Sequence, residues 1–453
     1  MAVYLGNNPV SVYNGGQNSI KTEEKTVTAG TSTVELTPDS GKLLSKVTVH
    51  PTPSQSKSVT PSSVDQNIIP DNGRLLSNVA VSGDADLIAE NIKSGVNIFG
   101  IDGTFEGKGQ YAWERYEYIA PIPYLRFIGN EDFTLKTENN AVNWNGTLEY
   151  STDTTTWNVW DGTEISSFGN NLYLRGTGNS YITGGQSGNK FVFTEDNNTL
   201  RISCEGNIEN LLDYETVNAG NHPAMANYCY FYMFRNCINL TIPPELPATT
   251  LADYCYEGMF YNCSNLTTAP QLPATTLATN CYANMFYGCT NLVTAPELHA
   301  TTLANYCYSN MFYGCTNLAT APDLPAITLA NYCYRGMFSD CTGLTITPKL
   351  PATTLANECY EGMFRGCTNL TTIPSLPATA LTNYCYEYMF YNCKKIKLSS
   401  TQTGNYQTAY RIPISGTGTT GTGSLSDMFG STGGTFKGTP TINTTYYTSN
   451  TVV

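Results

Sequence analysis

Charged residues are scarce in this chain of 453 residues: Asp, Glu, Lys and Arg make up 13% of it, about half of the usual share. The 36 acidic residues outnumber the 23 basic ones, so the formal net charge is −13. This acidic balance argues against nucleic acid as a partner, because binding to phosphates needs a basic face. So few charges also argue against long solvated helices and against a typical cytosolic enzyme surface.

Long apolar runs are lacking as well, and no segment approaches the ~18 apolar residues of a membrane-spanning helix. The opening MAVYLGNNPVSVYNGG has neither a basic segment nor an apolar core, and the first basic residue is Lys21, which is unlike a secretory signal peptide. Zinc sites need clustered ligands, whereas the histidines number only three and none recurs in the repeat described next. We therefore expect synthesis in a cytoplasm without export by the general route, no membrane insertion, and no metal or cofactor.

Cysteine, in contrast, is abundant and regularly placed. All of the 15 cysteines except Cys204 fall into two series, which start at Cys229 and Cys237 and step by 26 residues. A fixed period of this length is typical of stacked repeats. The series predict seven 26-residue units, none of which could bury its own apolar face without its neighbours.

Within one unit, Leu251, Cys255, Met259 and Cys263 follow one another at every fourth position. This spacing predicts the apolar stripe of an amphipathic helix. A short extended segment follows the stripe, and Pro270 ends it. The repeats are therefore expected to form a leucine-rich-repeat-like α/β solenoid of helix, turn, short strand and turn.

The repeated cysteines are predicted to be free. Cysteines eight residues apart on a helix would be separated by about 12 Å, and equivalent cysteines on stacked helices by about 8–10 Å. A disulfide needs Cα atoms within about 7 Å. We therefore expect a ladder of small, buried, apolar side chains.

Two recurring segments of the repeat carry a family resemblance. The MFYGCTNLTTAP-like and LPATTLANYCY-like segments resemble the BspA-type bacterial leucine-rich repeats, over about residues 223–400. The resemblance implies an extracellular binding role without catalytic residues, and it names no ligand.

The chain is expected to be multidomain, with β-rich modules in residues 1–110, a β-sandwich in 111–215, the solenoid in 216–400 and a C-terminal cap in 401–453. The sandwich is predicted from short alternating segments that Gly, Asn and Asp turns separate. These segments are 133–136, 146–150, 156–160, 171–175, 190–193 and 199–203. In the cap, the Met428-Phe429 pair repeats the Met-Phe pair of the units out of period, which predicts a degenerate last turn.

The N-terminal region contains a second internal repeat, PDSGKLLSKV at 38–47 and PDNGRLLSNV at 70–79. Each copy reads as a turn followed by a strand, with a linker at 51–63 between them and a short helix over 87–95 after them. Together with the opening segment and ENIKSGVNIFGIDGTFEG, these motifs resemble modules common in tail and fibre proteins of bacteriophages, over about residues 1–107. The resemblance implies attachment to a virion through the N-terminus and assembly as a homotrimer.

The candidate binding residues face away from the predicted core. They lie one repeat apart at one position of the unit, which suits a glycan or protein ligand: Tyr261, Tyr287 and Tyr313, flanked by Arg235, Arg365 and Tyr391. A second candidate is a carbohydrate site at Trp157 and Trp160, which have Asp153 and Asp161 as neighbours. The alternatives are solvent-facing variation for the tyrosines and core packing for the tryptophans.

The function predicted from these features is that of a bacteriophage tail or head fibre, which attaches to other virion proteins by its N-terminus and binds a glycan or protein of the host surface. A bacterial cell-surface leucine-rich-repeat adhesin is the first alternative. The second is a glycan depolymerase on a fibre, which would need two carboxylates ~5–10 Å apart across a cleft. Nothing in the sequence pairs such residues, so no enzymatic activity is expected.

Overall fold

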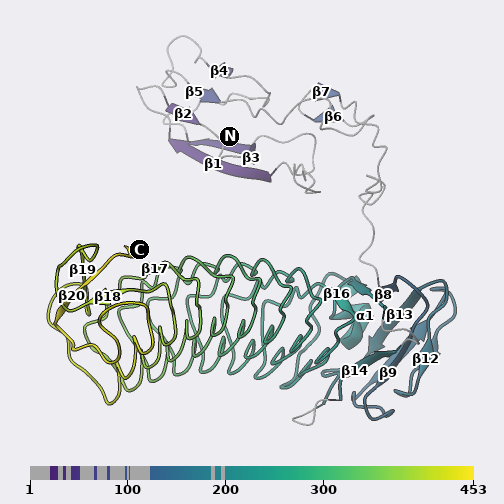
Figure 1. Ribbon diagram of the computed structural model, residues 1–453. Helices are drawn as coiled ribbons and strands as arrows, with labels where there is room; N and C mark the ends of the chain where they lie inside the picture. Colours follow the sequence, from purple (N-terminus) through teal and green to yellow (C-terminus); the bar gives the residue numbers. More distant parts are fainter. Residues whose placement is uncertain are drawn as a thin grey trace. The chain divides into compact units, whose positions relative to one another are not determined.

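The computed structural model describes residues 123–184, 189–194 and 199–453, together with seven short strands before residue 103. The chain divides into two units, Met1–Ile119 and Ala120–Val453, which are coloured along the sequence in Figure 1. No helix in the described residues combines the length and the apolar character that crossing a membrane requires.

The first unit contains short strands in three groups. The strands β1 and β3 are parallel; β5 pairs with β2 in parallel and with β4 in antiparallel orientation; β6 and β7 are antiparallel. Their bounds are β1 Lys21–Thr28, β2 Val34–Leu36, β3 Lys42–His50, β4 Gln66–Ile68, β5 Val79–Val81, β6 Asn97–Ile98 and β7 Ile101–Asp102. Strand β3 contains the predicted strand of the first PD(S/N)G copy, whereas the expected linker at 51–63 and helix at 87–95 lie outside the described residues.

The second unit begins with two sheets whose inner faces share a core. The larger sheet has the strand order β11-β10-β13-β8-β15-β16, and the smaller has β12-β9-β14. All six segments predicted from alternation overlap a strand. The bounds are β8 Leu125–Gly129, β9 Thr134–Thr137, β10 Thr147–Ser151, β11 Asn158–Val159, β12 Ile165–Ser166, β13 Asn171–Thr177, β14 Phe191–Thr194, β15 Ile202–Glu205 and β16 Leu240–Ile242.

Alternation of side chains explains how the two sheets form this core. Burial alternates strictly along β8 and β13, as period-two side-chain placement requires. Phe127 of β8 lies 5.1 Å from Phe193 of β14 between ring centroids, across the gap between the sheets. The helix α1 (Asn210–Asn218) packs on β13, where it approaches so closely that a Cβ at Gly176 would lie 1.8 Å from the Leu211 carbonyl oxygen.

In the repeat region, the predicted helices are absent, and this corrects the α/β prediction. Helix α1 is the only helix in the continuous stretch 199–453. The described part of Ala120–Val453 is therefore β-rich with few helical residues. The segment expected to be helical forms successive turns instead, with positive φ at every fourth residue: Tyr254 (61°), Gly258 (58°) and Asn262 (57°). Left-handed residues at this interval are incompatible with a right-handed helix.

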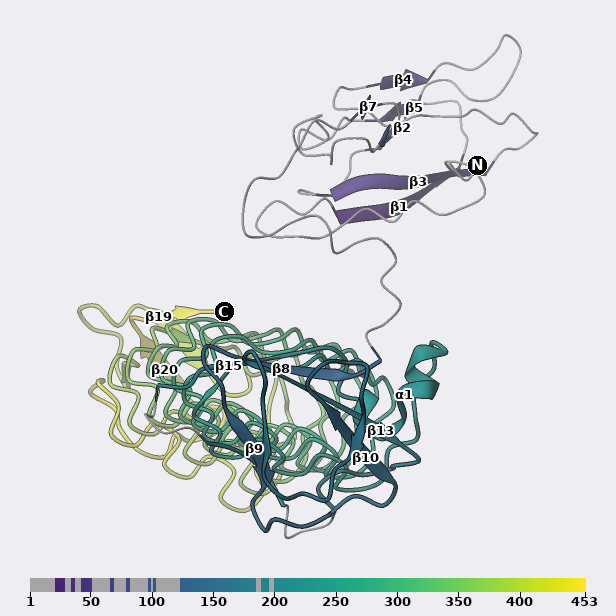
Figure 2. The same ribbon diagram turned by 90° about the vertical axis from the view of Figure 1, so that its right-hand side faces the viewer.

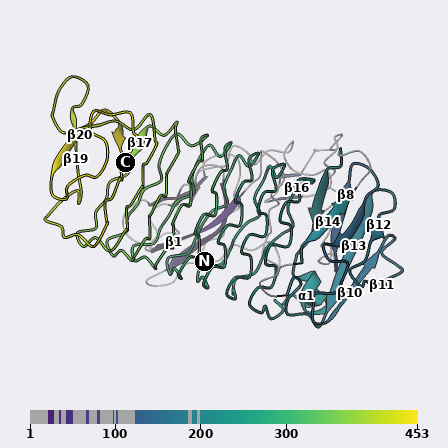
Figure 3. The ribbon, with the colours of Figure 1, turned by 60° about the horizontal axis from the view of Figure 1, so that its bottom comes forward.

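Backbone hydrogen bonds in these turns go to two kinds of partner. The N–H of Met259 donates to the carbonyl of Tyr256 at 3.2 Å, which closes a turn within the coil. The N–H of Phe260 donates to Met285 at 2.9 Å, in the following coil. The same alternation recurs in later coils, so hydrogen bonds join the stacked turns along the array. Figure 3 shows the stacked coils from below.

The four-residue spacing describes the buried stripe correctly but not its backbone. In a helix, four residues turn through about 400°, so a stripe at this spacing drifts by ~40° per step. In the coil every fourth residue returns to the same side. Cys255, Met259 and Cys263 are fully buried, and Leu251 at the start of the predicted stripe is partly buried. Tyr256 and Phe260, the neighbouring row, are buried as well.

Columns of identical side chains fill the centre of the stack. Phe286, Phe312 and Phe338 lie 5.6 and 5.7 Å apart between ring centroids and are nearly parallel. The cysteine thiols point at backbone carbonyls, as when Cys289 Sγ donates to the Phe260 oxygen at 3.1 Å. All 15 cysteines are free and buried, which confirms the prediction made for the repeated ones.

Different segments cover the two ends of the array. At the first coil, the N–H of Phe191 in β14 donates to Met233 at 2.8 Å, and β15 runs parallel to β16, so the sandwich takes the place of a preceding coil (Figure 2). At the last coil, the N–H of Phe390 donates to Met428 at 2.9 Å, as expected for a degenerate last turn. The remaining strands belong to this end: β17 Thr372–Ile373, β18 Leu398–Ser399, β19 Thr408–Arg411, β20 Thr445–Thr448 and β21 Thr451–Val452.

Candidate binding surfaces

The predicted tyrosine column exists as a continuous stack. Tyr261, Tyr287 and Tyr313 are partly exposed, and each ring centroid lies 4.5 Å from the next, with interplanar angles of 9° and 2°. The stack forms because these residues occupy the same position of consecutive coils, which backbone hydrogen bonds hold in register. Since the ring faces cover one another, the column presents ring edges and hydroxyl groups to solvent.

At one end of this column, a tyrosine hydroxyl is hydrogen-bonded to a carboxylate. Tyr313 donates a hydrogen bond to Asp340, and this bond, together with burial, raises the pKa of Tyr313 to about 12. Burial and the neighbouring Tyr261 also raise the pKa of Tyr287, whereas its hydrogen bond with Tyr313 opposes this rise. Tyr287 and Tyr313 therefore stay protonated and neutral over the physiological range, and their hydroxyl groups can donate as well as accept hydrogen bonds.

The other predicted members lie at the same coil position but do not extend the stack. Ser339 occupies the position between Tyr313 and Arg365 and interrupts the aromatic column. The Arg365 guanidinium lies 5.5 Å from the ring centroid of Tyr391, so these two form a separate cation–π pair.

At the opposite end, Arg235 lies 5.5 Å from the ring centroid of Tyr232. The structure therefore divides the six predicted residues into a stack and two flanking groups.

A second tyrosine column was not predicted from the sequence. Tyr228 and Tyr254 are stacked at 4.5 Å, and Tyr306 and Tyr332 at 4.2 Å. Asn280 stands at the equivalent position between these two pairs. Their 26-residue spacing was visible in the recurring ANYCY-like segment, but the helix prediction gave no reason to place this position on the surface.

Aromatic side chains connect the two columns at the first coils. The Tyr228 ring meets Phe231 edge to face at 5.3 Å, Phe231 meets Tyr232 at 4.6 Å, and Tyr232 lies 5.7 Å from Tyr261. The two columns and this connection are called the tyrosine surface below: Tyr228, Phe231, Tyr232, Tyr254, Tyr261, Tyr287, Tyr306, Tyr313 and Tyr332.

Charged side chains lie between the two columns at later coils. Arg335 Nε is 3.0 Å from Glu361 Oε2 and 4.0 Å from Glu358 Oε2. Burial, followed by the hydrogen bond to Glu358, raises the pKa of Glu361 to about 7. Glu257 has no such cation: burial raises its pKa to about 7, and hydrogen bonds from Asn280 and Asn284 oppose this rise.

The two predicted tryptophans lie in different environments. Trp160 is 1% exposed, stacks on Trp144 at 5.2 Å and donates its Nε1–H to the Thr163 carbonyl. Because no ligand can reach a ring in the core, Trp160 is removed from the predicted binding residues, and core packing explains it.

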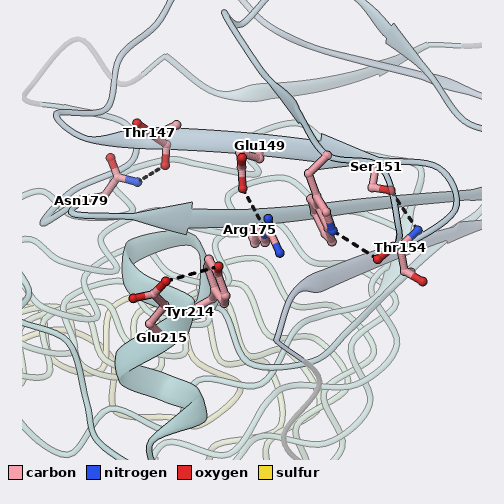
Figure 4. A network of polar contacts seen from close by, with 9 residues as sticks. Thr147, Glu149, Ser151, Thr154, Arg175, Asn179, Tyr214 and Glu215 are labelled. Atoms are coloured by element: carbon pink, nitrogen blue, oxygen red, sulfur yellow. Dashed lines mark hydrogen bonds and ion pairs between the residues drawn. The ribbon is translucent and has the colours of Figure 1, made fainter.

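Trp157 is partly exposed and contacts a polar cluster on the outer face of the larger sheet, of which Glu149, Arg175 and Tyr214 are labelled in Figure 4. The Arg175 guanidinium lies between the rings of Trp157 and Tyr214, at 4.0 and 4.5 Å from their centroids. Arg175 Nε also contacts Glu149 Oε2 at 2.7 Å. The Trp157 ring is thus already stacked on a cation, which leaves less of it for a sugar.

Comparison with known proteins identifies the repeats. Residues 214–345 and 298–410 match the family described as BspA type Leucine rich repeat region, in six copies. The chain therefore carries BspA-type leucine-rich repeats, whereas the count of seven units stays a prediction. No curated protein and no solved structure matches the chain. In the described part of the chain, no group of three His, Cys, Asp or Glu side chains is arranged to hold a metal ion.

Proposed function

We propose that this chain is a surface adhesin-like repeat protein that acts by binding, without catalysis, and that the tyrosine surface is where it contacts its partner. The observation that carries the proposal is the array of partly exposed tyrosines at recurring positions of the coil. Ring contacts connect the Tyr261 stack to Tyr228 and Tyr254, and Tyr306 and Tyr332 form a separate pair at the position of the second column. Tyrosine supplies a large contact area together with a polar tip, at a low entropy cost on binding. The BspA-type repeats support the same class of function.

Rigidity of the backbone also supports a binding role. The tyrosine positions lie in turns whose N–H groups are bonded within the coil or to the next one, as for Tyr287 to Asn284 at 3.1 Å and Gly288 to Tyr313 at 2.7 Å. A surface that is ordered before it meets its partner loses little conformational entropy on binding. A glycan or protein of a cell surface is the partner that this surface suits.

The test is adsorption of the purified full chain to cells or to a glycan array. Alanine at Tyr261, Tyr287 and Tyr313 together should weaken binding by at least about 30-fold, which is ~2 kcal/mol of a binding hot spot. The matched control is Tyr406→Ala, which changes a partly exposed tyrosine in the C-terminal cap. Equal binding by the triple variant and the control would refute the assignment of the surface.

The stack affects how this experiment is interpreted. Each stacked pair contributes about 0.5–1.5 kcal/mol, so the triple alanine variant should also lower the melting temperature. Tyr287→Phe separates the two effects, because it keeps the ring stack and removes one hydroxyl. If hydroxyl groups at the ring edges make the contact, this variant binds more weakly at an unchanged melting temperature.

A bacteriophage fibre is a finer version of this proposal, in which the first unit attaches the protein to a virion. It rests on the N-terminal motifs, which the matched repeat family does not cover. Tail, portal or capsid genes beside the coding gene would support it, and genes of cell-wall anchoring or secretion would favour the bacterial adhesin. The expected homotrimer is tested by sedimentation equilibrium of the full chain, where a monomer alone would contradict it.

A further inference from the structure

A cavity of about 240 Å³ lies where the first coil meets the segment that precedes it. One wall comes from the chain around the start of α1 and just after it, and the other from the end of the first coil. The residues that define it are Glu209, His222, Met225, Thr249, Thr250 and Leu251. None of them belongs to the tyrosine surface.

A buried carboxylate forms the floor of this cavity. The Glu209 side chain is 1% exposed, and its Oε2 lies 2.7 Å from His222 Nδ1, on an imidazole that is 52% exposed. Glu209 is the residue that precedes α1, but its side chain makes no capping hydrogen bond to the helix. Burying a carboxylate is costly unless it has partners. Besides His222, the Oε2 atom of Glu209 accepts a long hydrogen bond of 3.5 Å from Asn207 Nδ2, and no Lys or Arg in the described residues pairs with this carboxylate.

The first coil differs from the later coils on the side where this cavity lies. The equivalents of Thr249 and Thr250 in the next coil, Thr275 and Thr276, are exposed in the same way. The Glu209–His222 pair, however, belongs to the segment that covers the first coil, and that segment has no counterpart at later coils. A ligand site at this place therefore depends on the junction and not on the repeat.

We propose that this cavity binds one sugar residue, such as the terminal residue of a surface glycan. Its volume of about 240 Å³ is many times the ~10–15 Å³ that a single water needs, which leaves room for a monosaccharide. The carboxylate oxygens of Glu209 can accept hydrogen bonds from neighbouring sugar hydroxyls, and such charge-assisted bonds are about twice as strong as neutral ones. The Thr249 and Thr250 hydroxyls can donate or accept, and Met225 and Leu251 contact the apolar face of the ring.

Charge excludes two other ligand classes. An anionic ligand would be repelled by the buried carboxylate. A cationic ligand would have to displace or approach His222, which already occupies Glu209 Oε2 at 2.7 Å. A neutral polyol satisfies the remaining hydrogen-bonding capacity without either penalty, so the geometry favours it.

The experiment is saturation-transfer NMR and calorimetry of the full chain with a panel of methyl glycosides: glucoside, galactoside, mannoside, fucoside and N-acetylglucosaminide. At least one should bind saturably, with a dissociation constant in the millimolar range or below. Met225→Trp, which fills the cavity, and Glu209→Gln, which removes the charge, should each weaken this binding at least tenfold. The matched control His299→Ala removes another half-exposed histidine that lies beside a glutamate and should leave it unchanged.

Three outcomes would overturn the proposal: no glycoside binds the wild-type chain, binding survives in both Met225→Trp and Glu209→Gln, or tetramethylammonium binds in the cavity and the glycosides do not. If Glu209→Gln fails to fold, Met225→Trp and His222→Ala decide the question, because both positions are partly exposed. The triple tyrosine variant should keep full monosaccharide binding. Its result therefore separates a failure here from a failure of the tyrosine surface.

Discussion

Replacing Gly314 with alanine tests the conformation of the coils, because a helix and the observed turns predict opposite signs. Gly314 has φ of +70°, and a Cβ placed on it would meet nothing closer than the Cα of Gly288 at 3.8 Å. The substitution therefore introduces no clash, and its effect comes from the backbone alone.

The magnitude follows from two opposing terms. A left-handed conformation costs an L-residue roughly 1–2 kcal/mol, and the stiffer unfolded chain returns about 0.4–1 kcal/mol. Gly314→Ala should therefore lower the free energy of unfolding by about 1 kcal/mol. In the interior of a helix the same change would raise it by about 0.5–1 kcal/mol.

The assay is urea unfolding followed by far-ultraviolet circular dichroism. Gly288→Ala should lose more stability than Gly314→Ala, because its Cβ would lie 2.2 Å from the Asn262 Oδ1 atom. Asn317→Ala, an exposed position in the same coil, should stay within about 0.5 kcal/mol of wild type. A clear stabilisation by Gly314→Ala would refute the turn conformation and restore the helix.

Three further predictions follow from the core and the charges. Phe312→Ala should cost about 3–5 kcal/mol in thermal or urea unfolding, since it leaves a cavity between two stacked rings, and a loss under 1 kcal/mol would contradict the ring column. The thiols should react with Ellman's reagent only after denaturation, without any reductant, because burial raises the pKa of thiols such as Cys255 and blocks access to them; disulfide-linked peptides would contradict this. Glu257 has a folded pKa raised to about 7 from 4.5, so the folded state binds more protons than the unfolded state between these values. Its contribution to stability is complete below pH 4.5 and is lost as the pH rises through 7. Glu257→Gln should therefore raise the melting temperature at pH 8 relative to wild type. It should also flatten the pH dependence of the melting temperature between pH 4.5 and 7. Parallel pH profiles for the two proteins would contradict the raised pKa of Glu257.

Several structural features were predictable because they depend on period and on residue type. The 26-residue step places Phe286, Phe312 and Phe338 at one position of the coil, and any stacked arrangement brings such residues together. The thiol spacing excluded disulfides, and the free cysteines agree with that argument, although the coil that carries them is not helical. The tyrosine column at Tyr287 was predictable for the same reason as the phenylalanine column.

Other features depend on contacts between distant segments. Trp157 stacks on Arg175 and Trp160 is buried because the two tryptophans lie on different faces of the sheet. They are only three positions apart in the sequence, and the alternation of residues does not specify which face each of them takes. The Glu209–His222 cavity joins segments on either side of α1 to the end of the first coil. Its existence depends on the sandwich covering that coil.

The sequence by itself determined the period of the array, the set of buried side chains and the surface position of the first tyrosine column. The tertiary structure alone decided the backbone that carries them. An apolar residue at every fourth position is compatible with a helix, in which N–H groups bond four residues back, and with stacked turns, in which every second N–H bonds to the next coil. Asparagine and glycine at two of the three positive-φ positions, as at Gly258 and Asn262, favour the turns because these residues accept a positive φ at little cost. The choice is made by the neighbouring coil, which supplies the hydrogen-bond acceptors that an isolated unit lacks.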